Sequence, residues 1–181
     1  MTCHCSGASA HLFNKFFKNQ HGGCQHSLDA IWLRNKLKII VPNICICICT
    51  RNRQKELLKL LDSLSKIQIP SDSNIRIIVV ENDLEPYSEQ TVSQFSSQCK
   101  IEVNYFLETR RGISFARNRS VKEARLTDFC CFVDDDQIVT KNWLVELLKC
   151  QKEFNADGVW GPNPPIFSSF VPPYVIQFHS H

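Results

Sequence analysis

The chain has 181 residues, of which 43% are hydrophobic, and its formal net charge is +3 at pH 7. This length predicts one domain with an ordinary core, and the small charge indicates neither a nucleic-acid partner nor an anionic membrane surface. No apolar run is long enough to cross a bilayer, and the N-terminus lacks the basic and apolar regions of a secretory signal. We therefore expect a globular protein of the cytoplasm with no transmembrane segment.

The chain contains ten cysteines, which is many for its length. Cys45, Cys47 and Cys49 alternate with isoleucine, and Cys130 and Cys131 are adjacent in a second apolar run. Cysteines inside apolar strands are typical of free thiols that pack as small hydrophobic side chains, and not of a disulfide framework. We therefore predict free thiols and a reducing compartment.

Residues 1–38 show weak periodicity and are predicted to be a weakly ordered extension, so that the domain proper spans residues 39–181. The extension lacks the Cys-x-x-Cys and His-x-x-x-His pairs of structural zinc sites, so zinc binding is disfavoured. Its potential zinc ligands are Cys3, His4, Cys5, His11, His21, Cys24 and His26.

The first predicted element of the domain is a strand over residues 44–49, which are apolar and rich in isoleucine. Its alternation places isoleucines on one face and cysteines on the other, as in a central strand between two helical layers. A polar loop at residues 50–53 follows. Leucines at helical spacing then predict a helix over residues 53–67 that ends before Pro70. These elements form the first half of a βαβ unit.

The same order of strand and helix repeats along the middle of the chain. Residues 75–80 predict a second strand that ends at Glu81, and residues 85–98 predict a helix weakened by serine and threonine. Residues 101–107 alternate and predict a third strand. A further helix follows Gly112, and the residues at its helical spacing are Ile113, Ala116, Val121 and Ala124.

Positive charge surrounds the predicted helix start at Gly112. Arg110, Arg111 and Arg117 lie next to it in the sequence, and a glycine permits close approach of a ligand to the backbone. Helix N-termini and guanidinium groups both favour phosphate or carboxylate groups. This segment is therefore a candidate anion-binding loop.

The most informative stretch is residues 129–137, in which five uncharged residues run into Asp134, Asp135 and Asp136. The apolar part predicts a strand buried on both faces. The aspartates stand where that strand leaves the sheet, which is the edge where open α/β sheets bind ligands. Adjacent carboxylates repel one another unless a cation lies among them, and a divalent cation carrying a phosphate ester is the common solution. A solvated acidic turn is the alternative interpretation.

The last predicted helix begins at a Thr140 cap. Residues 158–162 predict a short strand that turns into a loop, and no regular element is predicted after Pro162. The alternation of strands and helices predicts an α/β fold, a three-layer α/β/α sandwich with a mostly parallel central sheet. The expected inward residues of the last helix are Leu144, Leu147, Leu148 and Phe154.

Four polar loops, at residues 50–53, 81–83, 112–118 and 134–136, are thus predicted at one edge of the sheet. In this order they resemble the family-2 glycosyltransferases over about residues 44–167. That family has a single nucleotide-sugar-binding α/β domain of the A type, with a Thr-aromatic-Asn-Arg loop and an acid after the second strand. A Gly-x-x-x-Ala-Arg-Asn helix start and an Asp-x-Asp motif follow, and both are present here. Two positions depart from the pattern: Arg51 replaces the aromatic residue, and Glu81 replaces the commoner aspartate.

The resemblance implies metal-assisted transfer of a sugar, with inversion, from a nucleotide-diphosphate sugar to an unknown glycan, lipid or protein acceptor. Thr50 and Glu81 would hold the base or the ribose, with Arg117 alongside the base. Asp134 would contact the ribose or the diphosphate, and Asp136 would ligate Mg²⁺ or Mn²⁺. The implied location is the cytoplasm, with a peripheral position at the inner face of a membrane as an alternative. The implied nucleotide-sugar site also includes Arg53, Gly112 and Asp135.

The catalytic base is unknown, because inverting members use a carboxylate that lies beyond the matched region. Asp157 is the last carboxylate of the chain and is a poor candidate at a predicted strand start. We therefore expect the donor-binding half of the fold, incomplete at the C-terminus, and whether it is an enzyme stays open. The first alternative function is a truncated, catalytically inactive nucleotide-sugar-binding module.

A second alternative is a phosphatase-type hydrolase, because Asp134 and Asp136 after an apolar strand also fit an aspartyl-phosphate nucleophile and its partner acid. That class needs a downstream lysine and a further acidic pair, and the chain has neither after Trp160. A dehydrogenase is disfavoured because the glycine-rich dinucleotide fingerprint is absent.

Overall fold

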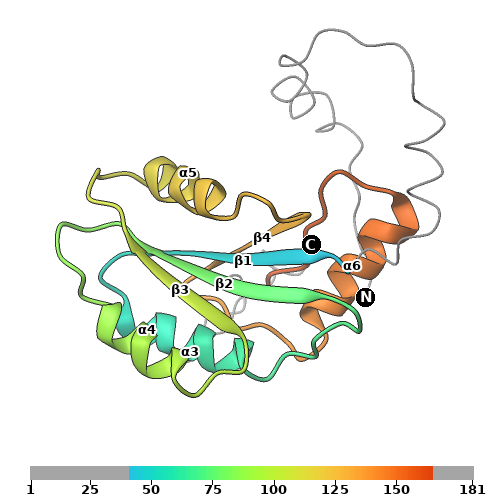
Figure 1. Ribbon diagram of the computed structural model, residues 1–181, viewed down its shortest axis with the longest axis horizontal. Coiled ribbons are helices and arrows are strands. Elements are labelled where there is room, and N and C mark those ends of the chain that lie inside the picture. The colour runs from blue at the N-terminus through green and yellow to red at the C-terminus, as the bar shows by residue number, and fades with distance from the viewer. Residues whose placement is uncertain (1–40, 165–181) are drawn as a thin grey trace, which may run out of the picture. The chain divides into compact units, whose positions relative to one another are not determined.

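The computed structural model describes residues 41–164, which alternate between strands and helices (Figure 1). The predicted extension with its potential zinc ligands, and residues 165–181, lie outside the described residues. Residues 41–146 belong to one compact unit and residues 147–164 to another, and each is described by itself. The elements in chain order are β1 (Asn43–Thr50), α3 (Gln54–Leu64), β2 (Asn74–Glu81), α4 (Glu89–Ser96), β3 (Glu102–Leu107), α5 (Ile113–Glu123), β4 (Phe129–Asp134) and α6 (Trp143–Phe154).

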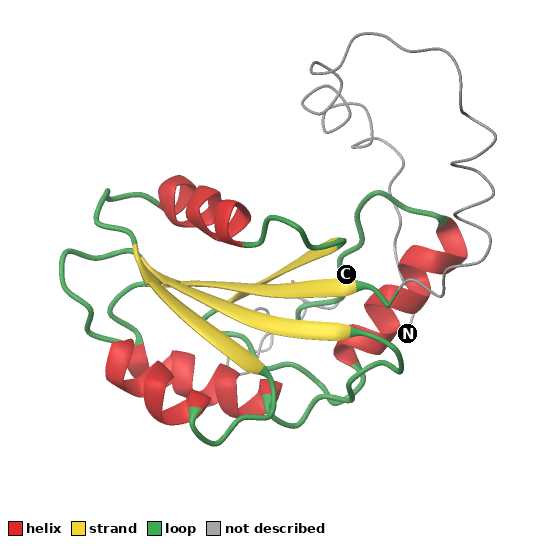
Figure 2. Cartoon of the chain, viewed as in Figure 1, coloured by secondary structure: helices red, strands yellow, loops and turns green. Residues whose placement is uncertain are grey.

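The four strands form one sheet in the order β3-β2-β1-β4, and every neighbouring pair is parallel (Figure 2). Thr50 pairs with Glu81, and Glu81 pairs with Leu107, so three strands end at the same level. β4 ends beside them, since Asp134 pairs with Cys49. The carboxyl ends of all four strands therefore meet at one edge, as the sequence predicts.

Helices cover both faces of the sheet, which confirms the predicted α/β sandwich. Helix α5 lies on one face, while α3 and α4 lie together on the other (Figure 1). Cys45 and Cys47 of β1 pack with Ala116 and Ala124 on the α5 side. The isoleucines of β1 alternate with these cysteines and are fully buried, as are the inward leucines of α3. Those leucines are Leu57, Leu60, Leu61 and Leu64.

The inward face of α5 differs from the prediction. Ile113 and Val121 are each 53% exposed, whereas Ala116, Ser120 and Ala124 are buried. These three residues are spaced four apart, so they share one face of the helix. Small side chains line the contact of α5 with β1 and β2, and the larger apolar residues of the helix point away from it.

Strand β4 is not buried on both faces, so that prediction is wrong. Its Phe132 is 43% exposed and the Cys130 side chain is exposed. The reason is its position, because β4 is an edge strand whose only partner within residues 41–164 is β1.

Three predictions about the last described segment are also wrong. Helix α6 begins at Trp143, and the carbonyl of Asn142 accepts the first backbone bond from Glu146, so Thr140 is not the cap residue. Phe154 is 55% exposed rather than inward. Residues 158–162 form no strand, because they make no backbone pairing with another segment of the described chain.

The strand cysteines are free thiols, as predicted: Cys45, Cys47, Cys49, Cys130 and Cys131. Within residues 41–164 no helix is both long enough and apolar enough to cross a membrane.

Candidate functional site

The polar loops at the carboxyl edge of the sheet are joined by a network centred on Asp135. Asp135 is buried, and its carboxylate accepts two hydrogen bonds, one from the last residue of β1 and one from the loop that follows. Thr50 Oγ1 donates to Asp135 Oδ2 at 2.8 Å, and the Arg53 guanidinium donates to Oδ1 at 3.2 Å. The same Arg53 nitrogen donates to Asp136 Oδ2 at 3.0 Å. One arginine therefore bridges two of the three adjacent carboxylates.

The two carboxylates that Arg53 bridges differ in their exposure to solvent. The Asp135 charge, followed by its hydrogen bond, raises the pKa of Arg53. The Asp135 side chain is 8% exposed, whereas those of Asp136 and Arg53 are about half exposed. Asp136 thus keeps an oxygen that faces solvent, while Asp135 serves mainly to hold Thr50 and Arg53 in place.

Asp134 and Arg117 form a separate, looser pair at the same edge. Arg117 lies 3.6 Å from Asp134 Oδ1, and both side chains are more than half exposed. An ion pair with this exposure contributes little to stability, so both groups are free to exchange their partner for a ligand. Gln137 fixes the turn itself, because its side-chain oxygen accepts from the Asp134 backbone and its own backbone N–H donates to the Asp134 carbonyl.

Asn82, which the sequence analysis did not single out, holds the loop that contains Gly112. Its side-chain nitrogen donates to the carbonyls of Glu108 at 2.9 Å and Arg110 at 2.7 Å. Its side-chain oxygen accepts from the Gly112 backbone at 2.9 Å. Gly112 has a φ of 133°, a conformation that residues with a Cβ rarely adopt. The start of α5 is therefore positioned by an amide from the end of β2.

The structure gives a direct expectation for Asn82. Asn82→Ala removes three hydrogen bonds from a side chain that is 5% exposed, and it should lower the free energy of unfolding by about 2 kcal/mol. Urea denaturation measures this value. Asn104→Ala is the matched control, because that amide makes only an exposed bond to Glu102, and its cost should stay within about 0.5 kcal/mol. Equal costs for the two variants would contradict the role of Asn82.

Arg110 forms an ion pair with Glu108 and makes no hydrogen bond to the three aspartates among the described residues. Its guanidinium donates to both Glu108 oxygens, at 2.8 and 2.9 Å, and lies 4.8 Å from the centre of the Phe115 ring. Hydrogen bonds from the Arg110 side chain, followed by its backbone bond, hold the pKa of Glu108 to about 2. This pair shapes the loop before α5 and does not extend the Asp135 network.

The lowered pKa of Glu108 predicts a pH dependence of stability. A carboxyl whose pKa falls on folding stabilises the fold above its ordinary value of 4.5, and that contribution is lost as the pH falls toward 2. Glu108→Gln should therefore flatten the dependence of unfolding free energy on pH between about 4.5 and 2. Urea denaturation at a series of pH values measures it, and Arg110→Gln should flatten the same window. An unchanged slope in both variants would refute this expectation.

Glu81 belongs to a separate hydrogen-bond network, formed with Ser88 and Tyr105. It is fully buried, and it accepts from the Ser88 backbone at 2.8 Å, the Ser88 hydroxyl at 2.9 Å and the Tyr105 hydroxyl at 2.6 Å. Burial, followed by the bond to Glu81, raises the pKa of Tyr105. Since the Glu81 carboxylate has no exposed surface, contact with a base or ribose requires this network to open. Its role in ligand binding stays a prediction.

Comparison with known proteins identifies the family. Residues 45–178 match the model of Glycosyl transferase family 2. The chain belongs to this family. The predicted resemblance to the family-2 glycosyltransferases is thereby confirmed.

A curated relative agrees with this assignment, and several solved structures share the fold. The succinoglycan biosynthesis protein ExoM of Rhizobium meliloti (strain 1021) is 31% identical over 140 residues, which are 76% of this chain and 45% of ExoM. This family-2 chain therefore spans less than half the length of that relative. S. aureus TarS 1-349 has a TM-score of 0.55 and 24% identity over 64% of this chain and 34% of TarS 1-349. TarS 1-349 has also been solved with UDP-GlcNAc and with UDP.

A third similar protein is the mannosyltransferase PcManGT from Pyrobaculum calidifontis, solved in complex with GDP-Man and Mn2+. Its TM-score is 0.55, with 18% identity over 61% of this chain and 32% of PcManGT. At these identities the solved structures bear on the fold alone. They confirm the predicted α/β fold class.

The exposed aspartates suit a divalent cation by their chemistry. Mg²⁺ and Mn²⁺ prefer carboxylate oxygens, and Mg²⁺ is commonly held by one or two carboxylates together with substrate phosphates and waters. Asp136 offers an oxygen that faces solvent, and Asp134 is 62% exposed nearby in the sequence. Within residues 41–164 no three acidic, histidine or cysteine side chains are gathered closely enough to form a complete metal cage.

Proposed function

We propose that this chain binds a nucleotide-diphosphate sugar and a divalent cation at the carboxyl edge of its sheet, as the donor-binding part of a glycosyltransferase. The observation that carries the proposal is the bridge of Arg53 between Asp135 and Asp136. It places fixed positive charge beside an open carboxylate at the edge where α/β sheets bind their ligands. Family membership supports the proposal, as do the UDP-GlcNAc and GDP-Man complexes of similar proteins.

Each group at this edge has a role in the proposed donor complex. Asp136 would hold the cation, which neutralises the charge that develops on the diphosphate as the sugar bond breaks. Arg53 would face the diphosphate as a hydrogen-bond donor once its carboxylate partners turn to the ligand, and Arg117 would lie alongside the base. Thr50 would hold the base or the ribose, and Asp134 would contact the ribose or the diphosphate. Asn82 fixes the backbone of Gly112. Because Gly112 has no Cβ, its backbone would approach the ligand closely.

The expected stereochemical outcome is inversion, which needs a base that removes a proton from the acceptor hydroxyl. The described edge contributes donor-binding groups, and we assign none of them to that step. An inactive nucleotide-sugar-binding module is therefore the second candidate.

Calorimetry and a release assay together test both candidates. The chain should bind UDP or GDP in the presence of Mn²⁺ and bind the same nucleotide more weakly when the metal is chelated. Release of the nucleotide from the corresponding nucleotide sugar would show an active enzyme, and binding without release would show the inactive module. No binding of either diphosphate, with or without Mn²⁺, would contradict the proposed function.

A further inference from the structure

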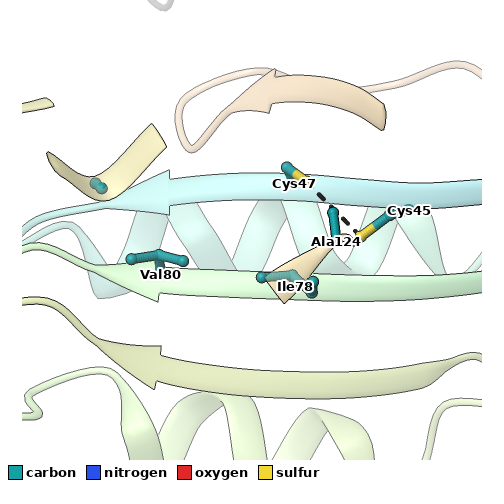
Figure 3. Close-up of a cluster of buried hydrophobic side chains, with 6 residues drawn as sticks. Cys45, Cys47, Ile78, Val80 and Ala124 are labelled. Carbon is teal, nitrogen blue, oxygen red and sulfur yellow. Dashed lines mark hydrogen bonds between the residues drawn. The ribbon is translucent and has the colours of Figure 1, made fainter. Parts of the chain in front are cut away.

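An arginine and two cysteines on neighbouring strands form a row across the sheet near the amino ends of the strands. The register pairs Arg76 of β2 with Cys45 of β1, and Cys45 with Cys130 of β4. Paired residues of parallel strands point to the same face, so these three side chains share the face that α5 covers. Cys47 lies on that face too, and its thiol donates to the Cys45 sulfur at 3.7 Å (Figure 3).

The three thiols differ in their access to solvent. Cys45 and Cys47 are fully buried, whereas Cys130 is exposed on the edge strand β4. The Thr127 hydroxyl lies 3.7 Å from the Cys130 sulfur. Cys130 therefore combines an accessible sulfur with hydrogen-bonding neighbours and with further thiols directly behind it.

The neighbours of Cys130 favour its thiolate. The neighbouring Cys47 thiol is the main influence that lowers the pKa of Cys130 to about 6, and the Thr127 hydroxyl and the Arg76 charge act in the same direction against desolvation. Among the groups around it, Cys47 and Cys45 come from β1 and Arg76 from β2. The adjacent Cys131 is the natural comparison, because burial raises its pKa to about 12.

We propose that Cys130 is a modification site, at which hydrogen peroxide oxidises the thiolate and Cys45 resolves the product as a disulfide between β4 and β1. In the first step the Cys130 sulfur attacks the peroxide, the O–O bond breaks, and a sulfenic acid forms with release of hydroxide. In the second step the Cys45 sulfur attacks the Cys130 sulfur, and the second oxygen leaves as water after protonation. Two thiols lose two electrons, and the peroxide is reduced to two waters.

Strand geometry favours Cys45 as the resolving partner. Directly paired residues of neighbouring strands lie about 4.8 Å apart, within the separation of about 4.4–6.8 Å that disulfides bridge. Cys47 pairs instead with Phe132, which places it two residues further along β1. Cys47 therefore lies outside the directly paired Cys45–Cys130 row, and its thiol donates to the Cys45 sulfur.

This site is distinct from the proposed nucleotide site. Cys45 lies five residues before Thr50, where β1 reaches the carboxyl edge, and Cys130 lies four residues before Asp134 on β4. The thiol reaction uses none of the residues assigned to the nucleotide sugar. Its test is therefore independent of whether the chain binds a nucleotide.

Alkylation and oxidation of the full chain test the proposal without any variant. At pH 7, iodoacetamide should modify Cys130 at least about tenfold faster than Cys131, as measured by peptide mass spectrometry. The rate should fall as the pH drops through about 6. Stoichiometric hydrogen peroxide, followed by blocking of free thiols, should yield the Cys45–Cys130 linked peptide pair.

Variants then separate the two steps. Cys130→Ser should abolish the linked pair, and Cys45→Ser should leave a Cys130 sulfenic acid that dimedone traps. Cys99→Ser is the matched control on another surface and should leave the linked pair intact. Equal alkylation of Cys130 and Cys131 in the unmodified chain would overturn the proposal. A peroxide product that links Cys130 to Cys47, or links it to neither thiol of β1, would also overturn it.

Discussion

Asp136→Ala is expected to remove the metal-dependent part of nucleotide-diphosphate binding. Asp136 contributes the solvent-facing oxygen beside the Arg53 bridge, so its loss leaves the cation without its proposed protein ligand. The affinity for UDP or GDP in the presence of Mn²⁺ should fall at least about tenfold, because loss of groups that merely support a metal ligand costs about 10- to 100-fold. Affinity measured with the metal chelated should stay the same. Isothermal titration calorimetry measures both values.

Two further variants make this result specific. Asp62→Ala removes a carboxylate that pairs with Lys66 on the surface of α3, away from the carboxyl edge, and should change neither affinity. Asp136→Asn keeps an oxygen that can accept from Arg53 but loses the charge, so it should resemble Asp136→Ala. If both substitutions at Asp136 leave the Mn²⁺-dependent affinity intact, Asp136 is not a metal ligand.

Glu81→Ala is expected to be the most destabilising substitution at the carboxyl edge. Glu81 is fully buried, and its loss leaves the Tyr105 hydroxyl, the Ser88 hydroxyl and the Ser88 backbone N–H without their acceptor. Leaving buried donors unpaired costs about 1–3 kcal/mol, so the free energy of unfolding should fall by about 3 kcal/mol in total. Urea denaturation measures this loss.

Tyr105→Phe removes only the bond from the Tyr105 hydroxyl to Glu81. It should lower the free energy of unfolding by about 1 kcal/mol. The pair of variants also tests the binding role that the resemblance implied for Glu81. If Glu81 acts through the fold alone, Tyr105→Phe should leave nucleotide affinity unchanged. A Glu81→Ala variant that retains full stability would contradict the buried network.

The sequence predicts the architecture well because the sheet is parallel and covered by helices. Apolar runs such as Ile44–Cys49 and leucines at helical spacing indicate β1 and α3 with nearly correct bounds. Parallel strands bring their carboxyl ends to one edge, so the convergence of the four polar loops follows from the order of strands and helices alone. Edge position is harder to predict, which is why the exposure of Phe132 was missed.

The partners within the candidate site could not be predicted from spacing. Thr50, Arg53 and Asp135 come from loops more than 80 residues apart, and which side chain meets which depends on how those loops end. Asn82 stands among three polar residues, and nothing in its local sequence distinguishes it from its neighbours as the residue that holds the Gly112 loop. The motif position of Glu81 predicted a side chain that is accessible to a ligand. In the structure its carboxylate is instead bound by Ser88 and Tyr105.

The claim that a cation and a nucleotide bind at the carboxyl edge is tested most directly by paramagnetic broadening of backbone amide signals. Mn²⁺ added together with UDP or GDP should broaden the NMR signals of residues 50–53, 82–83, 112 and 134–137. Signals at the opposite ends of the same strands, at residues 43–45, 74–76 and 129–130, should stay sharp. Broadening at the amino ends instead, or equally along the strands, would contradict a binding site at the carboxyl edge.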